Sequence, residues 1–549
     1  MRTDNLRLYA AALCALALAA LALLAAPGSS TTRAQVTKPA VQTAKPPEAA
    51  RSLTARERRG RAIYLRGESP SGKEIGAVVG ELDVPASTVT CAGCHGARGE
   101  GKTEGGVTAG DLTWANLTKP YGHTHPTGRK HGPFTEESFA RAVAEGVDPS
   151  GNAMLQAMPR FKMSPEDMAD LLAYLKAIEH DRDPGLSEDS IRVGTLVPSK
   201  GGLAETGAAM RDVLAAFFAE LNARGGIYNR KVELRVADTQ GDAASAASAA
   251  RRLVADEQTF ALVGGLSAGA DKELAALTRE LEVPLVGPSS LLPQAAAGNR
   301  YTFYLLPGVA EMARSLVNFE SQKRAIKDVS VAVVYASGEI HETAAAAFEE
   351  QCRRAGCGTL RKHMYERGKF DAQAALKSLK GAEVVLFLGT GAGEEADFMR
   401  EADAAGWRPD VLLLGVLAGR ELAASVPAGF AGKVFLAFPS IPSDLTPEGR
   451  AELTALAEKY KFPARHVAAQ LSALAAAKVL VEGLQRGGKD LSRERLVTAL
   501  EGLYDFETGV TPRLTFGPNR RVGAAGAYVV TVDAERKTFV PSGEWVKSN

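Results

Sequence analysis

The sequence predicts a multidomain protein in which a small, all-α unit precedes a larger α/β unit with two lobes. At 549 residues, the chain is too long for a single hydrophobic core. Two helical segments, at 54–65 and 164–178, bracket a Gly-rich region with few strand candidates. From residue 191 onward, short apolar strands alternate with helical runs, which is typical of parallel, doubly wound sheets. That part spans about 360 residues, so we expect two lobes.

The first 34 residues predict an export signal and therefore a periplasmic location. A basic head precedes an unbroken apolar run at 8–26, which is the pattern of a secretory signal peptide, with cleavage expected near residues 32–34. The run is close to the roughly 18–20 residues that span a bilayer, so an uncleaved anchor is the alternative. Residues 35–52 are rich in Pro, Ala, Thr and Lys and predict an extended, disordered tether.

The second helix of the first unit carries ordinary start signals and apolar spacing. Ser164 lies at an N-cap position and Pro165 in the first turn of the second helix. Its apolar residues Met168, Leu171 and Leu175 recur at helical spacing. These two helices therefore bound a compact unit at 53–180, followed by a short hydrophilic linker at 181–190.

The second unit, residues 191–549, is predicted to be built from repeated strand–helix units. Apolar segments predict eight strands, at 191–197, 232–236, 260–263, 283–286, 329–335, 383–388, 411–414 and 434–438. Helical runs lie between the first of them, at 210–221, 247–256 and 271–281.

The most specific motif is Cys91-Ala92-Gly93-Cys94-His95, the C-x-x-C-H pattern of covalent haem attachment. Two thiols three positions apart can each form a thioether to a haem vinyl group, and the adjacent imidazole then binds the iron. A zinc site would require a second ligand pair, and the chain has no other C-x-x-C. A thioredoxin-like pair would lie in a βαβ unit rather than in a Gly-rich region. The motif therefore predicts one covalent haem c held by Cys91, Cys94 and His95.

The other three of the five cysteines have separate expectations. Cys14 lies inside the apolar N-terminal run after a leucine, which does not suit a lipoprotein acceptor. Cys352 and Cys357 lie at the end of one helix and the start of the next strand. In an oxidising compartment they could form a disulfide, and two free buried thiols are the alternative.

Residues 53–180 resemble the class I cytochrome c family. The likeness rests on the order of a terminal helix, C-x-x-C-H-G, a Gly-rich loop, Met158-Pro159 and a last helix that ends in Ala173–Lys176. The segment 146–161 is similar to the cytochrome domains that accept electrons from quinoprotein alcohol and sugar dehydrogenases. The resemblance implies Met158 as the second iron ligand.

Other residues compete with Met158 as that ligand. Met154 and Met163 lie within five positions of it, and any of the three could instead pack in the core. A bis-His iron is a further alternative, with a ligand from the cluster His123, His125 and His131. Ligation by His and Met raises the haem potential relative to bis-His and closes the iron to substrates, which favours an electron carrier.

Residues 191–549 resemble the type 1 periplasmic binding proteins of the leucine/isoleucine/valine-binding family. The features that carry the likeness are Val193–Pro198, Leu221–Ile227, Val236–Asp242, Val263–Ser267 and Val283–Ser290. The resemblance implies two Rossmann-like lobes joined by three crossings. A ligand would then bind between the lobes, where loops follow the carboxyl ends of the strands.

The resemblance carries over only partly to the ligand-binding residues. Ser267, Ser289 and Ser290 match the places where the family holds a ligand carboxylate through hydroxyls and amides. Elsewhere the chain departs from the amino-acid binders. Leu291 stands where they usually have a Thr, and Ile340 or His341 where they have a Tyr. The second loop of the second lobe is Gly391–Gly393, and Leu417 stands where an acid binds the substrate ammonium. An ammonium group without a carboxylate in an apolar pocket is costly. We therefore expect small organic acids, aromatic acids or alcohol-derived metabolites to bind better than α-amino acids.

Composition and motifs limit the function. Lys and Arg number 65 against 64 Asp and Glu, so no basic excess points to nucleic acid. No nucleophile–base or paired-carboxylate pattern indicates an enzyme. The leading hypothesis is a mono-haem electron-transfer protein of a periplasmic dehydrogenase system, with a quinoprotein dehydrogenase or a terminal oxidase as redox partner and a module for a small organic ligand. The alternative is the receptor of an ABC importer, which docks on an ABC permease and carries an accessory cytochrome.

Overall fold

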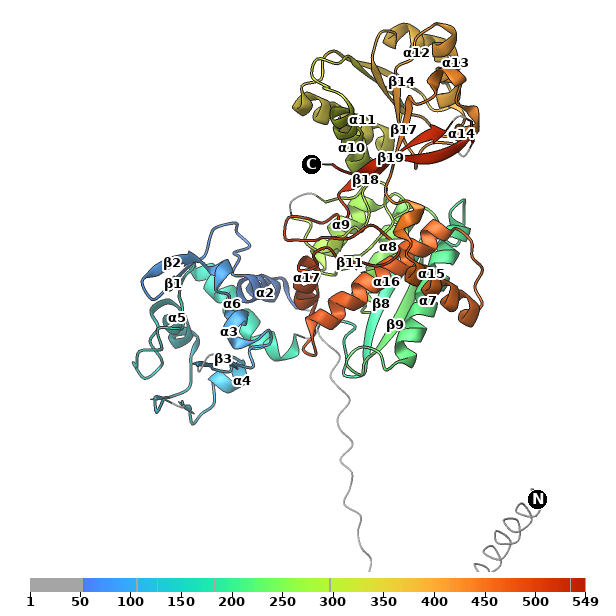
Figure 1. Cartoon of the computed structure of the whole chain (residues 1–549). Helices are drawn as coiled ribbons and strands as arrows, with labels where there is room; N and C mark the ends of the chain where they lie inside the picture. The colour runs from blue at the N-terminus through green and yellow to red at the C-terminus, as the bar shows by residue number, and fades with distance from the viewer. Residues whose placement is uncertain are drawn as a thin grey trace, which may run out of the picture. The chain divides into compact units, whose positions relative to one another are not determined.

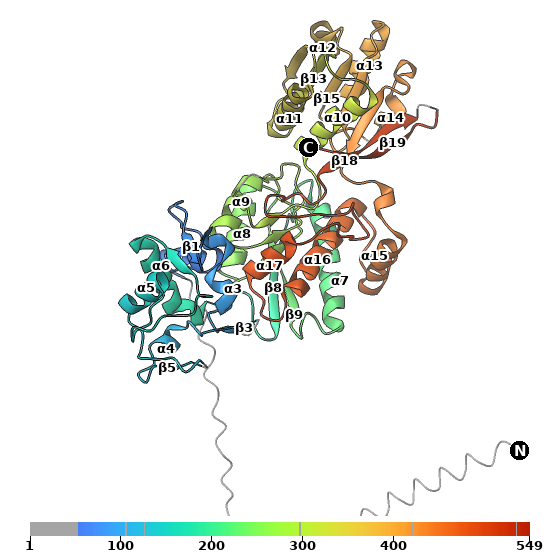
Figure 2. The ribbon, with the colours of Figure 1, turned by 60° about the vertical axis from the view of Figure 1, so that its left-hand side comes forward.

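The computed structural model describes residues 53–104, 107–125, 127–181, 183–295, 298–419, 421–533 and 535–548. The expected signal and tether lie outside these residues, and so does Cys14. The described residues belong to one compact unit. This unit contains a mainly helical N-terminal part followed by two α/β lobes, as the sequence predicts (Figures 1 and 2).

The N-terminal domain is helical with small antiparallel additions. Its helices are α2 (Ala55–Arg66), α3 (Cys91–His95), α4 (Trp114–Leu117), α5 (Glu136–Glu145) and α6 (Pro165–Ala177), with 3-10 turns η1 (Ala86–Thr88) and η2 (Ile178–His180). Strands β1 (Gly76–Val79), β2 (Leu82–Pro85) and β7 (Arg160–Lys162) form a sheet in the order β2-β1-β7. Two further pairs are β3 (Lys102–Glu104) with β4 (Val107–Ala109), and β5 (His123–Thr124) with β6 (Lys130–His131).

The terminal helices α2 and α6 pack closely because a glycine lies at their contact. A Cβ on Gly60 would lie 1.9 Å from the carbonyl oxygen of Asp170, so a larger residue would push the helices apart. Arg59 on α2 donates two hydrogen bonds to the Asp170 carboxylate on α6, at 2.6 and 2.9 Å. Each helix end lies within one residue of the predicted bound, with Ser164 as the N-cap that the sequence predicts and Thr54 as the N-cap of α2.

The first lobe has a five-stranded parallel sheet with helices on both faces. Its strands are β8 (Ser190–Val197), β9 (Lys231–Asp238), β10 (Ala261–Val263), β11 (Leu285–Val286) and β12 (Thr302–Phe303), in the order β12-β11-β10-β8-β9. Its helices are α7 (Ala204–Ala223), α8 (Ala243–Ala255), α9 (Asp271–Glu280), α15 (Pro447–Tyr460), α16 (Val467–Gly487) and α17 (Arg493–Glu501). Helices α8 and α9 share one hydrophobic core with the sheet, and the other four helices share the second.

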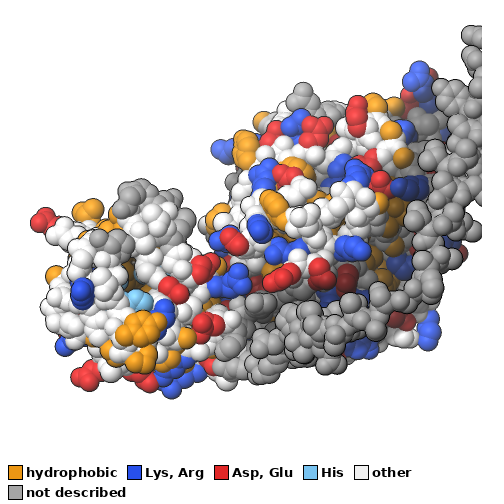
Figure 3. Space-filling model, turned by 90° about the horizontal axis from the view of Figure 1, so that it is seen from below, with side chains coloured by type: hydrophobic (Ala, Val, Ile, Leu, Met, Phe, Trp, Pro, Cys, Tyr) orange, Lys and Arg blue, Asp and Glu red, His pale blue; other side chains and the backbone are white. Residues whose placement is uncertain are grey.

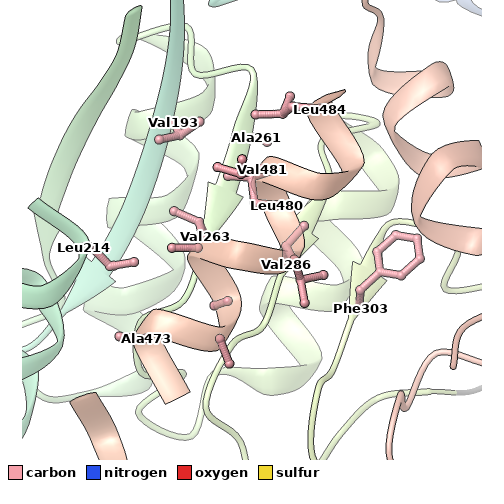
Figure 4. Close-up of a cluster of buried hydrophobic side chains, with 14 of the residues drawn as sticks. Val193, Leu214, Ala261, Val263, Val286, Phe303, Ala473, Leu480, Val481 and Leu484 are labelled. Carbon is pink, nitrogen blue, oxygen red and sulfur yellow. The ribbon is translucent and has the colours of Figure 1, made fainter. Parts of the chain in front are cut away.

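Helix α16 forms the centre of that second core. Figure 4 shows Ala473, Leu480 and Leu484 of α16 against Val263 and Val286 of the sheet. Among the described helices, α16 is the one with the length and apolarity to cross a membrane, yet 61% of its most apolar window is buried in the protein. Its hydropathy is therefore that of a core helix.

The second lobe has a seven-stranded sheet. Its strands are β13 (Val331–Ala336), β14 (Leu360–Tyr365), β15 (Val384–Leu388), β16 (Asp410–Leu414), β17 (Val434–Phe438), β18 (Gly526–Asp533) and β19 (Thr538–Lys547), in the order β14-β13-β15-β16-β17-β18-β19. The first five pair in parallel, and β18 pairs antiparallel with both β17 and β19. The helices are α10 (Val309–Lys323) and α11 (Glu339–Ala355) on one face, and α12 (Ala372–Leu379), α13 (Glu394–Ala404) and α14 (Leu422–Ser425) on the other, with 3-10 turns η3 (Ala428–Phe430) and η4 (Pro442–Asp444).

The chain passes between the lobes three times, as the resemblance implies. The crossings lie between β12 and α10, between β17 and α15, and before β18. The first and third run side by side, because the Gly523 amide donates to the Tyr304 carbonyl at 2.8 Å and the Ala524 amide to that of Leu305 at 3.0 Å.

The surface drawn in Figure 3 mixes acidic and basic side chains, in line with the near balance of charge in the sequence.

Candidate haem and ligand sites

The C-x-x-C-H motif lies on the short helix α3. Thr90 caps this helix, and its hydroxyl accepts a hydrogen bond from the Gly93 amide at 3.2 Å. Cys91 and Cys94 are one helical turn apart and therefore share a face. Both are free thiols, as two separate thioether bonds require.

His95 is prepared as a metal ligand. The side chain is buried, and its Nδ1 lies 2.7 Å from the Gly110 carbonyl oxygen. A carbonyl only accepts, so Nδ1 carries the proton and the lone pair of Nε2 is left for a metal. Burial lowers the pKa of His95, against the effect of the Gly110 hydrogen bond, and so favours the neutral imidazole that binds iron. The residues on α3 thus suit the covalent haem c that the sequence predicts.

Two tyrosines connect the haem motif to the terminal helices. The Tyr64 hydroxyl on α2 donates to the Gly96 carbonyl at 2.7 Å, directly after His95. The Tyr64 ring lies 5.6 Å from the ring of Tyr174 on α6. Both rings are buried, so the position of α3 is set by the same core that holds the helices.

The three candidate methionines lie at the edge of this core. Met154, Met158 and Met163 are all partly buried against it, so the packing alone does not select one of them, and ligation by Met158 stays a prediction. The Arg160 guanidinium donates to the carbonyl groups of Met158 and Met154. The guanidinium also occupies the space where a Cβ on Gly146 would lie, and Gly146 has the left-handed φ of 73°.

The loop before Met158 is organised around one buried carboxylate. Asp148 is fully buried and accepts hydrogen bonds from Arg129 Nη1 at 2.7 Å, from the Ser150 amide at 2.9 Å and from the Asn152 amide at 3.0 Å. The Asn152 side chain donates to it as well. Burial alone would raise the pKa of Asp148, but the hydrogen bonds from Asn152, Arg129 and Ser150 outweigh it and hold the pKa below its usual range.

The three histidines of the expected cluster do come together. The ring centroids of His123, His125 and His131 are 5.1 to 6.2 Å apart. Nε2 of His125 lies 3.0 Å from Nε2 of His131, and the other contacts of the rings include Arg129 and backbone carbonyls. Within the described residues, no group of three His, Cys, Asp or Glu side chains could hold a metal ion.

In the first lobe, the structure gives two of the three predicted serines a partner within the protein. Ser267 Oγ donates to Asp271 Oδ2 at 3.1 Å, and the Asp271 carboxylate also has a hydrogen bond with the Ser290 side chain. Ser289 lies beside Ser267, whose amide is 3.4 Å from the Ser289 carbonyl. Burial raises the pKa of Asp271, against the effect of these hydrogen bonds. Sequence reasoning missed Asp271; the signal was an acid directly after a loop at the carboxyl end of a strand.

In the second lobe, the corresponding loops carry a histidine and an acid. His341 is buried, with Nε2 3.1 Å from the Gly389 carbonyl oxygen. Glu394 accepts from the Thr390 amide at 2.7 Å and from the Tyr365 hydroxyl at 2.8 Å. Gly391–Gly393 are exposed, and Leu417 packs on the hydrophobic core instead of offering a charge.

A buried ion-pair network joins the N-terminal domain, the linker and the first lobe. The Arg61 guanidinium on α2 pairs with Asp181 at 2.9 Å, Asp183 at 3.2 Å and Glu282 at 2.8 Å. Its side chain is only 7% exposed. The amide of the buried residue Arg493 also donates to Asp183, at 2.6 Å.

Two family models match the chain side by side. A model described as periplasmic binding protein matches residues 190–537, which is more than half of the chain. The chain belongs to the periplasmic binding protein family. A model described as cytochrome c matches residues 86–179, and a cytochrome c domain implies haem c. The family match also indicates the periplasm.

The curated relatives match the second unit over most of their own length. The Leu/Ile/Val-binding protein BraC3 of Rhizobium johnstonii is 26% identical over 341 residues, covering 60% of this chain and 89% of the relative. Leu/Ile/Val-binding protein homolog 3 of Brucella melitensis is 27% identical over 323 residues, covering 58% and 85%.

Solved structures share the fold of the two lobes. A branched chain amino acid ABC transporter protein from Thermus thermophilus with bound valine has a TM-score of 0.52 at 20% identity, covering 66% of this chain and 97% of the other. A fatty acid ABC transporter substrate-binding protein from Thermomonospora curvata has a TM-score of 0.51 at 18% identity, covering 67% and 95%. At these identities the likeness shows the fold and leaves the ligand open.

Proposed function

We propose that this protein is a periplasmic solute receptor of an ABC importer, in which an N-terminal domain with one covalent haem c acts as an electron carrier. The observation that carries the receptor function is the match of the complete two-lobed module to Leu/Ile/Val-binding proteins over 85–89% of their length. This supports the receptor hypothesis over that of a dehydrogenase-linked carrier. Its ligand is then a small organic molecule bound by the two-lobed module, and its transport partner is an ABC permease.

In the haem domain we assign Cys91 and Cys94 to the two thioether bonds. His95 would bind the iron through Nε2, because its Nδ1 donates to Gly110. Met158 would be the second protein ligand of the iron, on a loop that Asp148 and Arg160 hold in place. The bound haem c would supply reversible one-electron transfer.

In a second candidate function, the haem domain and the two-lobed module act together in electron transfer. Arg61 is buried between three carboxylates of the linker and the first lobe, which favours a fixed haem domain over a loosely attached accessory. In this version the chain is the electron-transfer protein of a periplasmic dehydrogenase system, and the two-lobed module senses the substrate. Its redox partner would be a quinoprotein dehydrogenase or a terminal oxidase.

One experiment separates the two functions. The gene is deleted in its host, and uptake of labelled candidate solutes is measured beside dehydrogenase-dependent oxygen consumption. Loss of uptake alone supports the receptor, and loss of respiration alone supports the electron carrier. Genes for a permease and an ATPase next to this gene would agree with the first outcome, and a quinoprotein dehydrogenase gene with the second.

The covalent haem has its own test. Protein made in a host with cytochrome c maturation should keep its haem after denaturation and give a c-type pyridine haemochrome spectrum. Replacing both Cys91 and Cys94 by Ala should abolish the bound haem. A colourless protein with stoichiometric zinc would contradict the assignment.

A further inference from the structure

The first lobe presents a carboxylate where its family holds a ligand carboxylate. Asp271 begins α9, directly after the loop at the carboxyl end of β10, and its side chain is buried. The Ser267 and Ser290 hydroxyls, which we expected to serve a ligand, have hydrogen bonds with Asp271 instead. A ligand carboxylate at this place would meet like charge and two hydroxyls that are already engaged.

The second lobe presents a hydrogen-bond acceptor without a partner. His341 is 2% exposed, and its Nε2 must carry the proton because it faces the Gly389 carbonyl. Nδ1 is therefore an acceptor, and it has no hydrogen-bond partner among the residues that the structure describes. A Cβ built on exposed Gly338 would lie 4.0 Å from this Nδ1 and 4.0 Å from the Nε of Arg367, so the acceptor lies beneath an open turn, with a guanidinium nearby. An unpaired buried acceptor is costly unless a ligand satisfies it.

One ion pair connects the neighbourhoods of Asp271 and His341. Lys272 Nζ, next to Asp271, lies 2.5 Å from Glu339 Oε1, two residues before His341. The pair thus joins the first turns of α9 and α11, which belong to different lobes. Lys272 is already paired with Glu339, and Arg367 is a second cation, on the His341 side of the site.

We propose that the ligand presents hydrogen-bond donors, a hydroxyl or an ammonium group, to Asp271 and His341, and that Asp271 excludes ligands that would place a carboxylate there. This inference rests on the proposed receptor function and names the ligand class of the same site. Val416 is exposed on the loop after β16, and the carbonyl of its neighbour Leu417 lies 3.2 Å from a Cβ built on Gly391, in the loop that also holds His341, so an apolar remainder of the ligand would suit this side chain. The ligand class is therefore an amphipathic alcohol or amine, in contrast to the organic acids that the serines alone suggest.

The test uses probes that differ only in the head group. Isoamyl alcohol, isoamylamine, isovalerate and leucine share one skeleton, and phenylethanol, phenethylamine, phenylacetate and phenylalanine share another. Binding to the full-length holoprotein is measured by thermal shift and calorimetry, since ligands stabilise a receptor by mass action. We expect the alcohol or the amine of at least one skeleton to bind, and its carboxylate to bind at least about tenfold more weakly.

The Asp271→Asn variant should reverse this preference. Amine affinity should fall about tenfold or more with the loss of a charged partner, and the carboxylate probe should gain affinity because the repulsion is gone. Asp256→Asn, at an exposed position of the same lobe, is the matched control and should behave as wild type. His341→Phe should weaken the alcohol without admitting the carboxylate.

The outcomes separate the inference from the function on which it rests. Wild-type binding of a carboxylate or an amino acid in preference to the matching alcohol and amine, unchanged in Asp271→Asn, would overturn the inference and leave the receptor function standing. Failure of all eight probes with both wild type and Asp271→Asn would count against the receptor function and the inference together.

Discussion

Replacing Asp148 by Asn tests whether this buried carboxylate holds the loop of Met158. Every neighbour of Asp148 is a donor: Arg129, the Ser150 amide, and the backbone and side chain of Asn152. A carboxylate accepts on both oxygens, whereas an Asn amide accepts on one and donates on the other. Whichever way the amide turns, its NH₂ group faces either Arg129 or the two backbone amides.

The expected loss in the free energy of unfolding follows from these contacts. The variant loses at least one hydrogen bond of a charged group, worth about 1.5–3 kcal/mol, and leaves a buried donor unpaired at a further ~1–3 kcal/mol. We therefore expect the haem domain to lose about 3 kcal/mol, which for a domain of this size lowers its Tm by roughly 10 °C. The measurement is thermal unfolding of the holoprotein followed in the Soret region, with the Met–Fe(III) charge-transfer band as a reporter of the loop.

The pH dependence has a definite sign. The pKa of Asp148 is lowered in the folded protein, so its contribution is present above the unfolded value of about 3.9 and is lost as the pH falls through the folded value. The stability difference between wild type and Asp148→Asn should therefore shrink below about pH 4. Asp83→Asn, which breaks an exposed pair with Lys162 in the same domain, should change neither Tm nor the band. Equal stability of Asp148→Asn and wild type at neutral pH would refute the reasoning.

Three further predictions concern the iron ligand, the domain contact and the second pair of cysteines. Met158→Ala should abolish the Met–Fe(III) band, whereas Ala at either neighbouring methionine should leave it; persistence of the band in Met158→Ala would disprove the assignment. Arg61→Met leaves three partly buried carboxylates without their shared partner, at a cost of about 3 kcal/mol, and should lower the Tm of the haem domain, which Arg58→Met on the exposed side of α2 should not. The thiols of Cys352 and Cys357 are free but hydrogen-bonded to each other, so oxidation should join them and stabilise the second lobe by about 2 kcal/mol; alkylation of both thiols after mild oxidation would contradict this.

The fold could be predicted because its signals are local and repeated. Each of the eight predicted strands is present, since buried parallel strands appear in a sequence as short apolar runs. Two of the missed strands lack that signal, whereas β18 was missed although its sequence Ala527–Val532 is largely apolar. Strand β14, at the sheet edge, has the mixed sequence Leu-Arg-Lys-His-Met-Tyr, and β19 is interrupted by Pro541 and Gly543. The sheet β2-β1-β7 was missed because Ala77 pairs with Phe161, and nothing local to either segment indicates a partner so distant in the chain.

The haem motif and the ligand site differ in how far the sequence could define them. The C-x-x-C-H spacing contains its own geometry, because one helical turn places the two thiols on one face. The partner of a serine hydroxyl, in contrast, depends on rotamers and on the next helix. Ser267 could be recognised as a candidate from its loop, but its bond to Asp271 required the turn of the chain into α9. The second iron ligand is an intermediate case, since Met154, Met158 and Met163 all reach the same core.

The ligand of this protein does not follow from the ligands that the names of its relatives state, and particular residues explain why. The relatives are 26–27% identical and share the module, whose backbone packing depends on glycines such as Gly265, where a Cβ would lie 2.4 Å from the Leu196 carbonyl oxygen. Such positions maintain the fold of the lobes and do not determine which ligand binds between them. The head group of a ligand is selected by few side chains, and one acid among them reverses the sign of the local charge. Because Asp271 takes the serines that would otherwise bind a carboxylate, this protein can keep the fold of a Leu/Ile/Val-binding protein and still require a different head group in its ligand.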